Sequence, residues 1–115
     1  MLEHPPRTIH ARARIFRVAD DPNYSSFWDE VSDGVWEPET FAVLESFIKA
    51  DTDFVDIGSW IGPTVLFATS LGARCLAAEP DPTARAALNA NLALNPDLLE
   101  STVVSEKCIA AANAM

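Results

Sequence analysis

Two glycines and one acid carry the clearest chemical signal in this sequence. Residues 54–66 read FVDIGSWIGPTVL, with Gly58 and Gly62 directly after a short apolar run, and Glu79 follows Gly58 by 21 residues. A glycine at the end of a strand lets the backbone turn sharply and approach a ligand, and a second glycine lets the next helix pack closely. A carboxylate at the end of the next strand can accept hydrogen bonds from both hydroxyls of a ribose. We therefore expect a site for a nucleotide-like ligand.

Trp60 separates two classes of nucleotide-like ligand. A dinucleotide needs three glycines, in the pattern G-x-G-x-x-G, so that its pyrophosphate can sit on the amino terminus of the helix. Trp60 stands at the second of those positions and is bulky. A ligand without a phosphate, such as an adenosyl amino acid, tolerates this turn. We favour the adenosyl ligand and keep a nicotinamide-dependent oxidoreductase as the alternative.

The elements that must position these residues alternate between strand and helix. Residues 53–57 (DFVDI) are β-rich and apolar on both faces, as in a central strand that helices cover on both sides. Pro63 suits the start of the next helix and Gly72 its end. The remaining expected elements are a helix from about Pro38 with Phe41, Leu44 and Ile48 on one stripe, a strand at 74–78, a helix that Thr83 caps and that ends before Pro96, and a strand around 101–109.

This alternation predicts the fold class. Strands that alternate with helices build a parallel sheet with right-handed crossovers. We expect an α/β fold with a Rossmann-like, doubly wound parallel sheet, truncated after about the third strand. In such sheets ligands bind beyond the carboxyl ends of the strands, where the turn at 58–62 and the loop at 79–82 both lie.

Length and composition limit what the protein can be. The 115 residues suffice for one domain at most, and the hydrophobic fraction of 49% can fill a core. No apolar run approaches the ~18 to 20 residues of a membrane span, and the start of the chain has no apolar run typical of a secretion signal. We expect a soluble, cytoplasmic protein with no membrane partner.

Cys75 and Cys108 lack the spacing of metal ligands, so we expect buried, reduced thiols and no metal site.

Charge is distributed unevenly along the chain. The formal net charge is -9, and four of the eight basic residues lie near the amino terminus, namely Arg7, Arg12, Arg14 and Arg17. Nucleic acids bind to clustered Lys and Arg, which are missing beyond this arm, so we expect no nucleic-acid partner. Residues 1–24 look irregular, although 13–19 (ARIFRVA) suit a short edge strand. We interpret residues 1–32 as an N-terminal extension that is solvated or loosely docked.

Three blocks of the sequence resemble one enzyme family. FVDIGSWIGPTVL, followed by LAAEPDPTARAALNANLALNP at 76–96, is similar to the cofactor half of the FkbM-type methyltransferases, a class I S-adenosylmethionine-dependent group. The family pattern is D-I-G-x-x-I-G, then E-P-D-P, then a helix with N-x-x-L-N. Residues 34–48 (GVWEPETFAVLESFI) also resemble the segment before the turn in one branch of the family. The resemblance spans roughly residues 33 to 110 and implies that 33–115 is a partial S-adenosylmethionine-binding domain.

The resemblance also implies roles for single residues. The loop under the methionine part of S-adenosylmethionine would consist of Asp56, Gly58, Ser59, Trp60, Ile61 and Gly62. Glu79 would hold the ribose, with Pro80 and Asp81 at the edge of the adenine site. Two alternatives stay open here: Asp56 either bonds to nearby backbone amides or contacts the cofactor, and Trp60 either shields the cofactor or packs on the sheet. For Asn91 and Asn95 we expect hydrogen bonds to helix and loop rather than to substrate.

The resemblance implies little about the acceptor or the catalytic residues. It points to a small-molecule or glycan hydroxyl or amine, and no catalytic residue can be named, because the family's acceptor residues follow the third strand. Residues 108–115 read CIAAANAM where the family often has a polar residue. We expect the short chain to be weakly stable and inactive. We also expect the apolar helix face from Val65 to Leu71 to lose part of its cover, and the chain to self-associate through the unpaired edge of strand 53–57. A non-catalytic interaction module or a decayed gene product is the further alternative.

Overall fold

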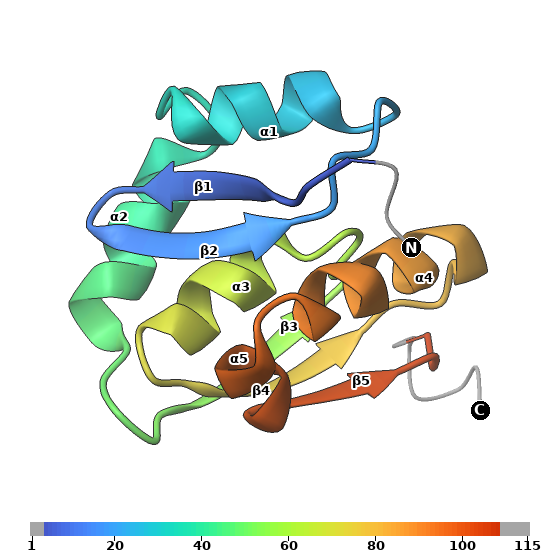
Figure 1. Cartoon of the computed structure of the whole chain (residues 1–115). Helices are drawn as coiled ribbons and strands as arrows, with labels where there is room; N and C mark the ends of the chain where they lie inside the picture. Colours follow the sequence, from blue (N-terminus) through green and yellow to red (C-terminus); the bar gives the residue numbers. More distant parts are fainter. Residues whose placement is uncertain (1–3, 109–115) are drawn as a thin grey trace.

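The computed structural model describes residues 4–108, which form two small sheets and five helices (Figure 1). The elements in chain order are β1 (Arg7–Ala11), β2 (Arg14–Val18), α1 (Ser25–Ser32), α2 (Pro38–Phe47), β3 (Asp53–Ile57), α3 (Pro63–Ser70), β4 (Arg74–Ala78), α4 (Pro82–Ala93), α5 (Pro96–Glu100) and β5 (Thr102–Ser105). None of the helices in this part of the chain is long and apolar enough to cross a membrane.

The larger sheet confirms the predicted fold class. Its order is β3-β4-β5 with all strands parallel, and Val55 lies opposite Leu76, which lies opposite Val103. The helices α3 and α4 form the crossovers between successive strands, as in a Rossmann-like sheet. Strands β3 and β4 have the predicted bounds, whereas β5 is shorter than the expected 101–109, of which residue 109 lies outside the described residues.

Helix α3 lies between the parallel sheet and the β1-β2 hairpin (Figure 1). Its sequence, PTVLFATS, is apolar on all sides, a pattern typical of a helix buried all round. Val65, Leu66 and Phe67 have no exposed surface. The expectation that the helix face from Val65 to Leu71 loses part of its cover is therefore wrong for its first residues, because the hairpin covers them.

The amino-terminal arm is part of the core. Residues 7–11 and 14–18 pair as an antiparallel hairpin, and in each strand the alternate side chains point inward, so that Ile9, Phe16 and Val18 are almost fully buried. The interpretation of this arm as irregular and loosely docked is thus wrong, whereas the short strand expected at 13–19 is confirmed as β2. Helix α1, which the sequence analysis also missed, packs on β1 and contributes the buried Trp28. The division of the chain after residue 32 stays a prediction.

One face of the parallel sheet is uncovered, in contrast to the expectation for 53–57. Val55, Ile57 and Val103 are 58%, 60% and 65% exposed, and no element of residues 4–108 packs over them. The helices and the hairpin lie on the opposite side (Figure 1). Because both crossovers run in the same direction across the sheet, both crossover helices cover the same face.

Two local predictions also need correction. Asp81, rather than Thr83, caps α4, since its Oδ2 accepts a hydrogen bond from the Ala84 N–H at 2.8 Å. Pro96 ends α4 as predicted but is also the first residue of the short helix α5, where proline is well tolerated. Cys75 is buried as expected, whereas Cys108 is exposed.

Candidate functional site

The glycine turn lies at the carboxyl end of β3, beside the end of β4. The N–H groups of Gly58 and Ser59 both donate to the carbonyl oxygen of Ala78, at 2.8 and 3.1 Å. Gly58, Trp60 and Gly62 have φ angles of 74°, 55° and 102°, in the left-handed region that favours glycine. The turn therefore reverses the chain within a few residues and is attached to the neighbouring strand.

The two glycines are required for different reasons. A Cβ on Gly62 would lie 2.6 Å from Leu88 Cδ1, so this glycine permits close packing of α3 against α4. A Cβ on Gly58 would meet no atom within 4 Å. Gly58 thus borders open space at the ligand-binding edge of the sheet, where a ligand can approach the backbone.

Glu79 joins the turn to the loop after β4. The residue is 7% exposed, its Oε1 accepts from the Trp60 N–H at 2.6 Å, and its Oε2 accepts from the Asp81 N–H at 2.9 Å. Charge-assisted hydrogen bonds of this kind are the stronger ones in proteins. Each carboxylate oxygen has a further lone pair, so the ribose contact expected for Glu79 stays a prediction beside this structural role.

Asp56 is half-buried on the covered side of the sheet, near the turn. Burial raises the pKa of its carboxyl, a hydrogen bond with Ser59 opposes this, and the charge of Glu79 raises the pKa further. Within the described residues, no backbone amide donates to this carboxylate, which removes the first of its two expected alternatives. Ser59 is itself buried, and its hydroxyl donates to the Asp56 carbonyl oxygen at 3.0 Å.

Trp60 packs on the segment that contains α1. Its ring meets Phe27 and Tyr24 edge-on, with ring centroids 4.7 and 5.8 Å apart, and 39% of the residue is exposed. The left-handed backbone costs a residue with a side chain about 1–2 kcal/mol, which the Glu79 hydrogen bond and the ring contacts offset. Packing on the sheet and shielding of a ligand, the two alternatives for Trp60, both stay predictions beside these ring contacts.

The loop after β4 is held by a residue that the sequence analysis did not select. Arg85 donates from Nη1 to the carbonyl oxygens of Glu79 and Pro80, at 3.0 and 3.1 Å. The Asp81 carboxylate caps α4 through one oxygen. Its expected place at the edge of the adenine site therefore requires the part of the residue that is exposed to solvent. Arg85 lies one helical turn after Asp81, but no motif in the sequence marks that spacing.

The amino terminus of α3 completes the site. Gly62 is its N-cap and supplies no side-chain acceptor, so the first-turn N–H groups and the positive end of the helix dipole lack a side-chain partner. The site can thus hold a polar ligand between the helix terminus and the Glu79 carboxylate. Within residues 4–108, no group of three or more His, Cys, Asp or Glu residues is placed to hold a metal ion.

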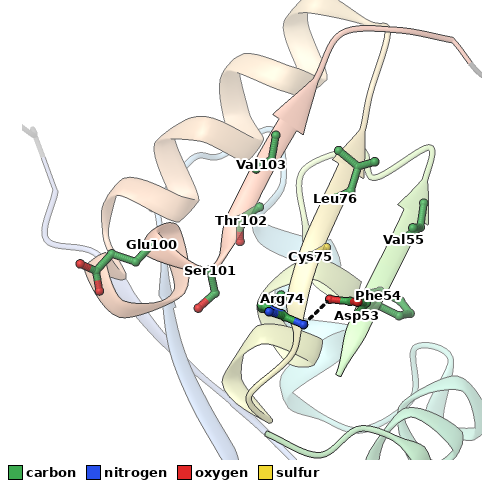
Figure 2. Close-up of a pocket in the computed structure, with 10 residues that line it drawn as sticks. All are labelled: Asp53, Phe54, Val55, Arg74, Cys75, Leu76, Glu100, Ser101, Thr102 and Val103. Carbon is green, nitrogen blue, oxygen red and sulfur yellow. Dashed lines mark ion pairs between the residues drawn. The ribbon is translucent and has the colours of Figure 1, made fainter. Parts of the chain in front are cut away.

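The uncovered sheet face carries a hollow that is separate from this site. It measures about 430 Å³ and is lined mainly by Val55, Leu76 and Val103 with the Arg74–Asp53 ion pair at one end, whose charged atoms are 3.0 Å apart (Figure 2). No residue of the glycine turn or of the loop at 79–82 lines it. The hollow is therefore a feature of the uncovered face.

Comparisons with known proteins identify the fold. No protein-family model and no curated protein matches the chain. Solved structures do match, and three of them are a protein described as an rRNA methylase, from Clostridium thermocellum (TM-score 0.57, 18% identity, 62% of this chain); a SAM-dependent methyltransferase from Agrobacterium tumefaciens (TM-score 0.62, 13% identity, 90% of this chain); and M. jannaschii TYW2 in complex with AdoMet (TM-score 0.53, 18% identity, 90% of this chain). The chain shares the fold of these methyltransferases.

The extent of the match limits this conclusion to the fold. The chain spans 41%, 32% and 43% of the lengths of those three proteins, in the same order. The likeness thus supports the class I methyltransferase fold expected from the sequence.

Proposed function

We propose that this chain is the cofactor-binding part of a class I S-adenosylmethionine-dependent methyltransferase. The observation that carries the proposal is the junction between the glycine turn and Glu79, where the Trp60 N–H donates to the Glu79 carboxylate at 2.6 Å. This junction lies at the carboxyl edge of a parallel sheet, where such folds bind their ligands. The solved structures with this fold include two described as SAM-dependent or bound to AdoMet.

The residues of the site fit the parts of S-adenosylmethionine. The free lone pairs of Glu79 can accept from the ribose hydroxyls, and the uncapped amino terminus of α3 suits the methionine carboxylate. Gly58 leaves space for the ligand beside the backbone, and Trp60 borders that space with its exposed edge. Asp56, Ser59, Ile61 and Gly62 complete the loop under the methionine part, and Pro80 and Asp81 border the adenine. S-Adenosylmethionine supplies an electrophilic methyl group on its sulfonium.

The proposal includes the FkbM-type family and its class of acceptor. We assign the acceptor as a small-molecule or glycan hydroxyl or amine, and the location as cytoplasmic.

Three of the arginines in the hairpin already have partners within the chain: Arg7 with Asp29, Arg12 with Glu45, and Arg14 with the Ser70 carbonyl oxygen. With a net charge of -9, this leaves little for the phosphate backbone of a nucleic acid. The proposal also includes that the chain by itself shows no turnover.

Isothermal titration calorimetry tests the proposal. The unmodified protein is expected to bind S-adenosylmethionine and to give no saturable signal with NAD. Gly58→Val should abolish binding, because it fills the open space and forces a branched residue to a φ of 74°. Glu79→Ala should weaken binding roughly ten- to a hundredfold, as expected for the loss of charge-assisted hydrogen bonds of about 1.5 to 3 kcal/mol.

The control for both variants is Glu100→Ala, which removes an exposed acid that lies outside the turn and the loop at 79–82. Its affinity should match that of the unmodified protein. Circular dichroism establishes that each variant is folded. A folded Gly58→Val protein with unchanged affinity, or saturable NAD binding without S-adenosylmethionine binding, would overturn the proposal.

A further inference from the structure

The side chain of Asn91 connects the glycine turn to the hairpin. Asn91 lies on α4 and is 3% exposed. Its Nδ2 donates to the carbonyl oxygen of Ile61, within the turn, at 2.9 Å. Its Oδ1 accepts from the N–H of Ala19, directly after β2, at 2.8 Å. One buried amide thus joins three segments that are distant in the sequence.

Only an amide of this length can make both contacts. The Ile61 carbonyl needs a donor and the Ala19 N–H needs an acceptor, and the side-chain amide of asparagine offers both in fixed directions. A carboxylate would turn the first contact into a repulsion between two oxygens, and an apolar side chain would leave both backbone groups without this partner. The loss costs most at the buried Ile61 carbonyl, which cannot turn to water, and less at the part-buried N–H of Ala19.

Asn95 makes a similar set of bonds without reaching the turn. Its Oδ1 accepts from the Arg17 N–H at 2.9 Å, and its Nδ2 donates to the Arg17 and Asn91 carbonyl oxygens, both at 2.8 Å. These bonds cover the outer edge of β2, which would otherwise expose unpaired backbone groups. Asn95 therefore holds the hairpin to α4 but has no bond to residues 58–62.

We propose that Asn91 is a positioning residue for the glycine turn. By holding the Ile61 carbonyl, it fixes the peptide between Ile61 and Gly62, and so the position of the first turn of α3. It also supports the left-handed backbone of Trp60, whose N–H is held from the other side by Glu79. The effect on ligand affinity rests on the proposed function, whereas the effect on the turn itself does not.

The experiment compares Asn91→Asp with Asn95→Asp as a matched control. Both variants replace an amide by the isosteric acid, Asn91 on α4 and Asn95 just after the end of α4. Asn91→Asp removes one hydrogen bond to a backbone carbonyl oxygen, and Asn95→Asp removes two. Asn91→Asp is expected to weaken S-adenosylmethionine binding by about tenfold or more, since the loss of one buried hydrogen bond to the turn is worth about that much. Asn95→Asp should lower the melting temperature but leave the affinity within about twofold.

A second measurement follows the turn directly. Amide hydrogen exchange, measured by NMR, should become faster at Gly58 and Gly62 in Asn91→Asp and remain unchanged there in Asn95→Asp. In the unmodified protein, exchange of the Asn91 side-chain amide protons should slow when S-adenosylmethionine is added, whereas Asn95 should not respond. This last measurement needs no variant and therefore holds even where Asn91→Asp does not fold.

The possible results separate the two proposals. If the unmodified protein does not bind S-adenosylmethionine, the proposed function fails, and the exchange rates of the turn in the two variants still decide the role of Asn91. The positioning role would be overturned if both variants changed amide exchange at Gly58 and Gly62 equally. It would also be overturned if two variants of equal stability lost equal affinity for S-adenosylmethionine. A selective effect of Asn91→Asp on both readouts would establish it.

Discussion

The two faces of the parallel sheet differ in what covers them. On one face, Cys75 and Ala77 are buried beneath α3 and α4, which the hairpin covers in turn (Figure 1). On the other, Val55, Leu76 and Val103 form a row of exposed apolar side chains across all three strands (Figure 2). Successive residues of a strand point to opposite faces, so neighbours in the sequence have opposite environments.

The exposed apolar residues show which face of the parallel sheet has a composition suited to a further layer of structure. Strands of parallel sheets are apolar on both faces when helices cover both, and β3 has this pattern. Yet Leu76 and Val103 are 42% and 65% exposed, and within residues 4–108 nothing packs on them. The matched region makes up 41%, 32% and 43% of the solved structures with this fold, so each of them is longer than the chain. The composition of the sheet thus suits a cover that the described residues do not provide.

The largest expected contrast between the two faces is in stability. Phe67 is fully buried above the covered face and stacks on Phe41 with ring centroids 4.4 Å apart. Phe67→Ala should lower the free energy of unfolding by about 3–5 kcal/mol, because it removes buried contacts and leaves a cavity. Leu76→Ala, on the open face, should cost less than about 1 kcal/mol. Urea denaturation measures both, and equal losses would show that the open face is covered in solution.

The next contrast is in thiol reactivity. Burial raises the pKa of Cys75 to about 12, and the charge of Asp56 adds to this. The reactive species is the thiolate, so at pH 8.5 the reaction of Cys75 with iodoacetamide should be roughly a thousandfold slower than that of an ordinary exposed thiol. Leu76→Cys places a thiol on the adjacent residue but on the open face, and Cys108→Ser provides the background. Similar labelling rates for the two positions would contradict the assigned faces.

The smallest expected effect concerns self-association, which stays a prediction. An exposed apolar face beside the unpaired edge of β3 favours contact between chains. Val103→Asp should weaken self-association by about tenfold, since a charge at the contact would have to lose its water. Ala86→Asp makes the same change of charge at an exposed position of α4 and should have little effect. Light scattering at several concentrations provides the readout, and a wild-type protein that stays monomeric throughout would refute the prediction.

Predictions from the sequence succeeded where the determining residues are close together. Strands 53–57 and 74–78 have the predicted bounds, and Pro63 starts α3 as expected, because β-branched runs, proline and glycine act on their own backbone. Of the hairpin, the sequence predicts the strand at 13–19 but not its partner β1, because a short alternating pattern interrupted by arginines resembles a solvated arm. The inner side chains of the hairpin become buried only when they pack on α3. The cap of α4 was placed at Thr83 instead of Asp81, a shift of two residues within the correct turn.

By itself, the sequence determined the α/β alternation, the turn with its glycines, and an acid at the end of the next strand. Only the tertiary structure decided what those residues contact. The Glu79 carboxylate meets the Trp60 N–H across 19 residues, and Asn91 meets Ile61 across 30 residues and Ala19 across 72. Local propensities act over a few residues, whereas such pairs form only when the packing of the whole core brings their segments together. The same packing buried one face of the sheet and left the other open.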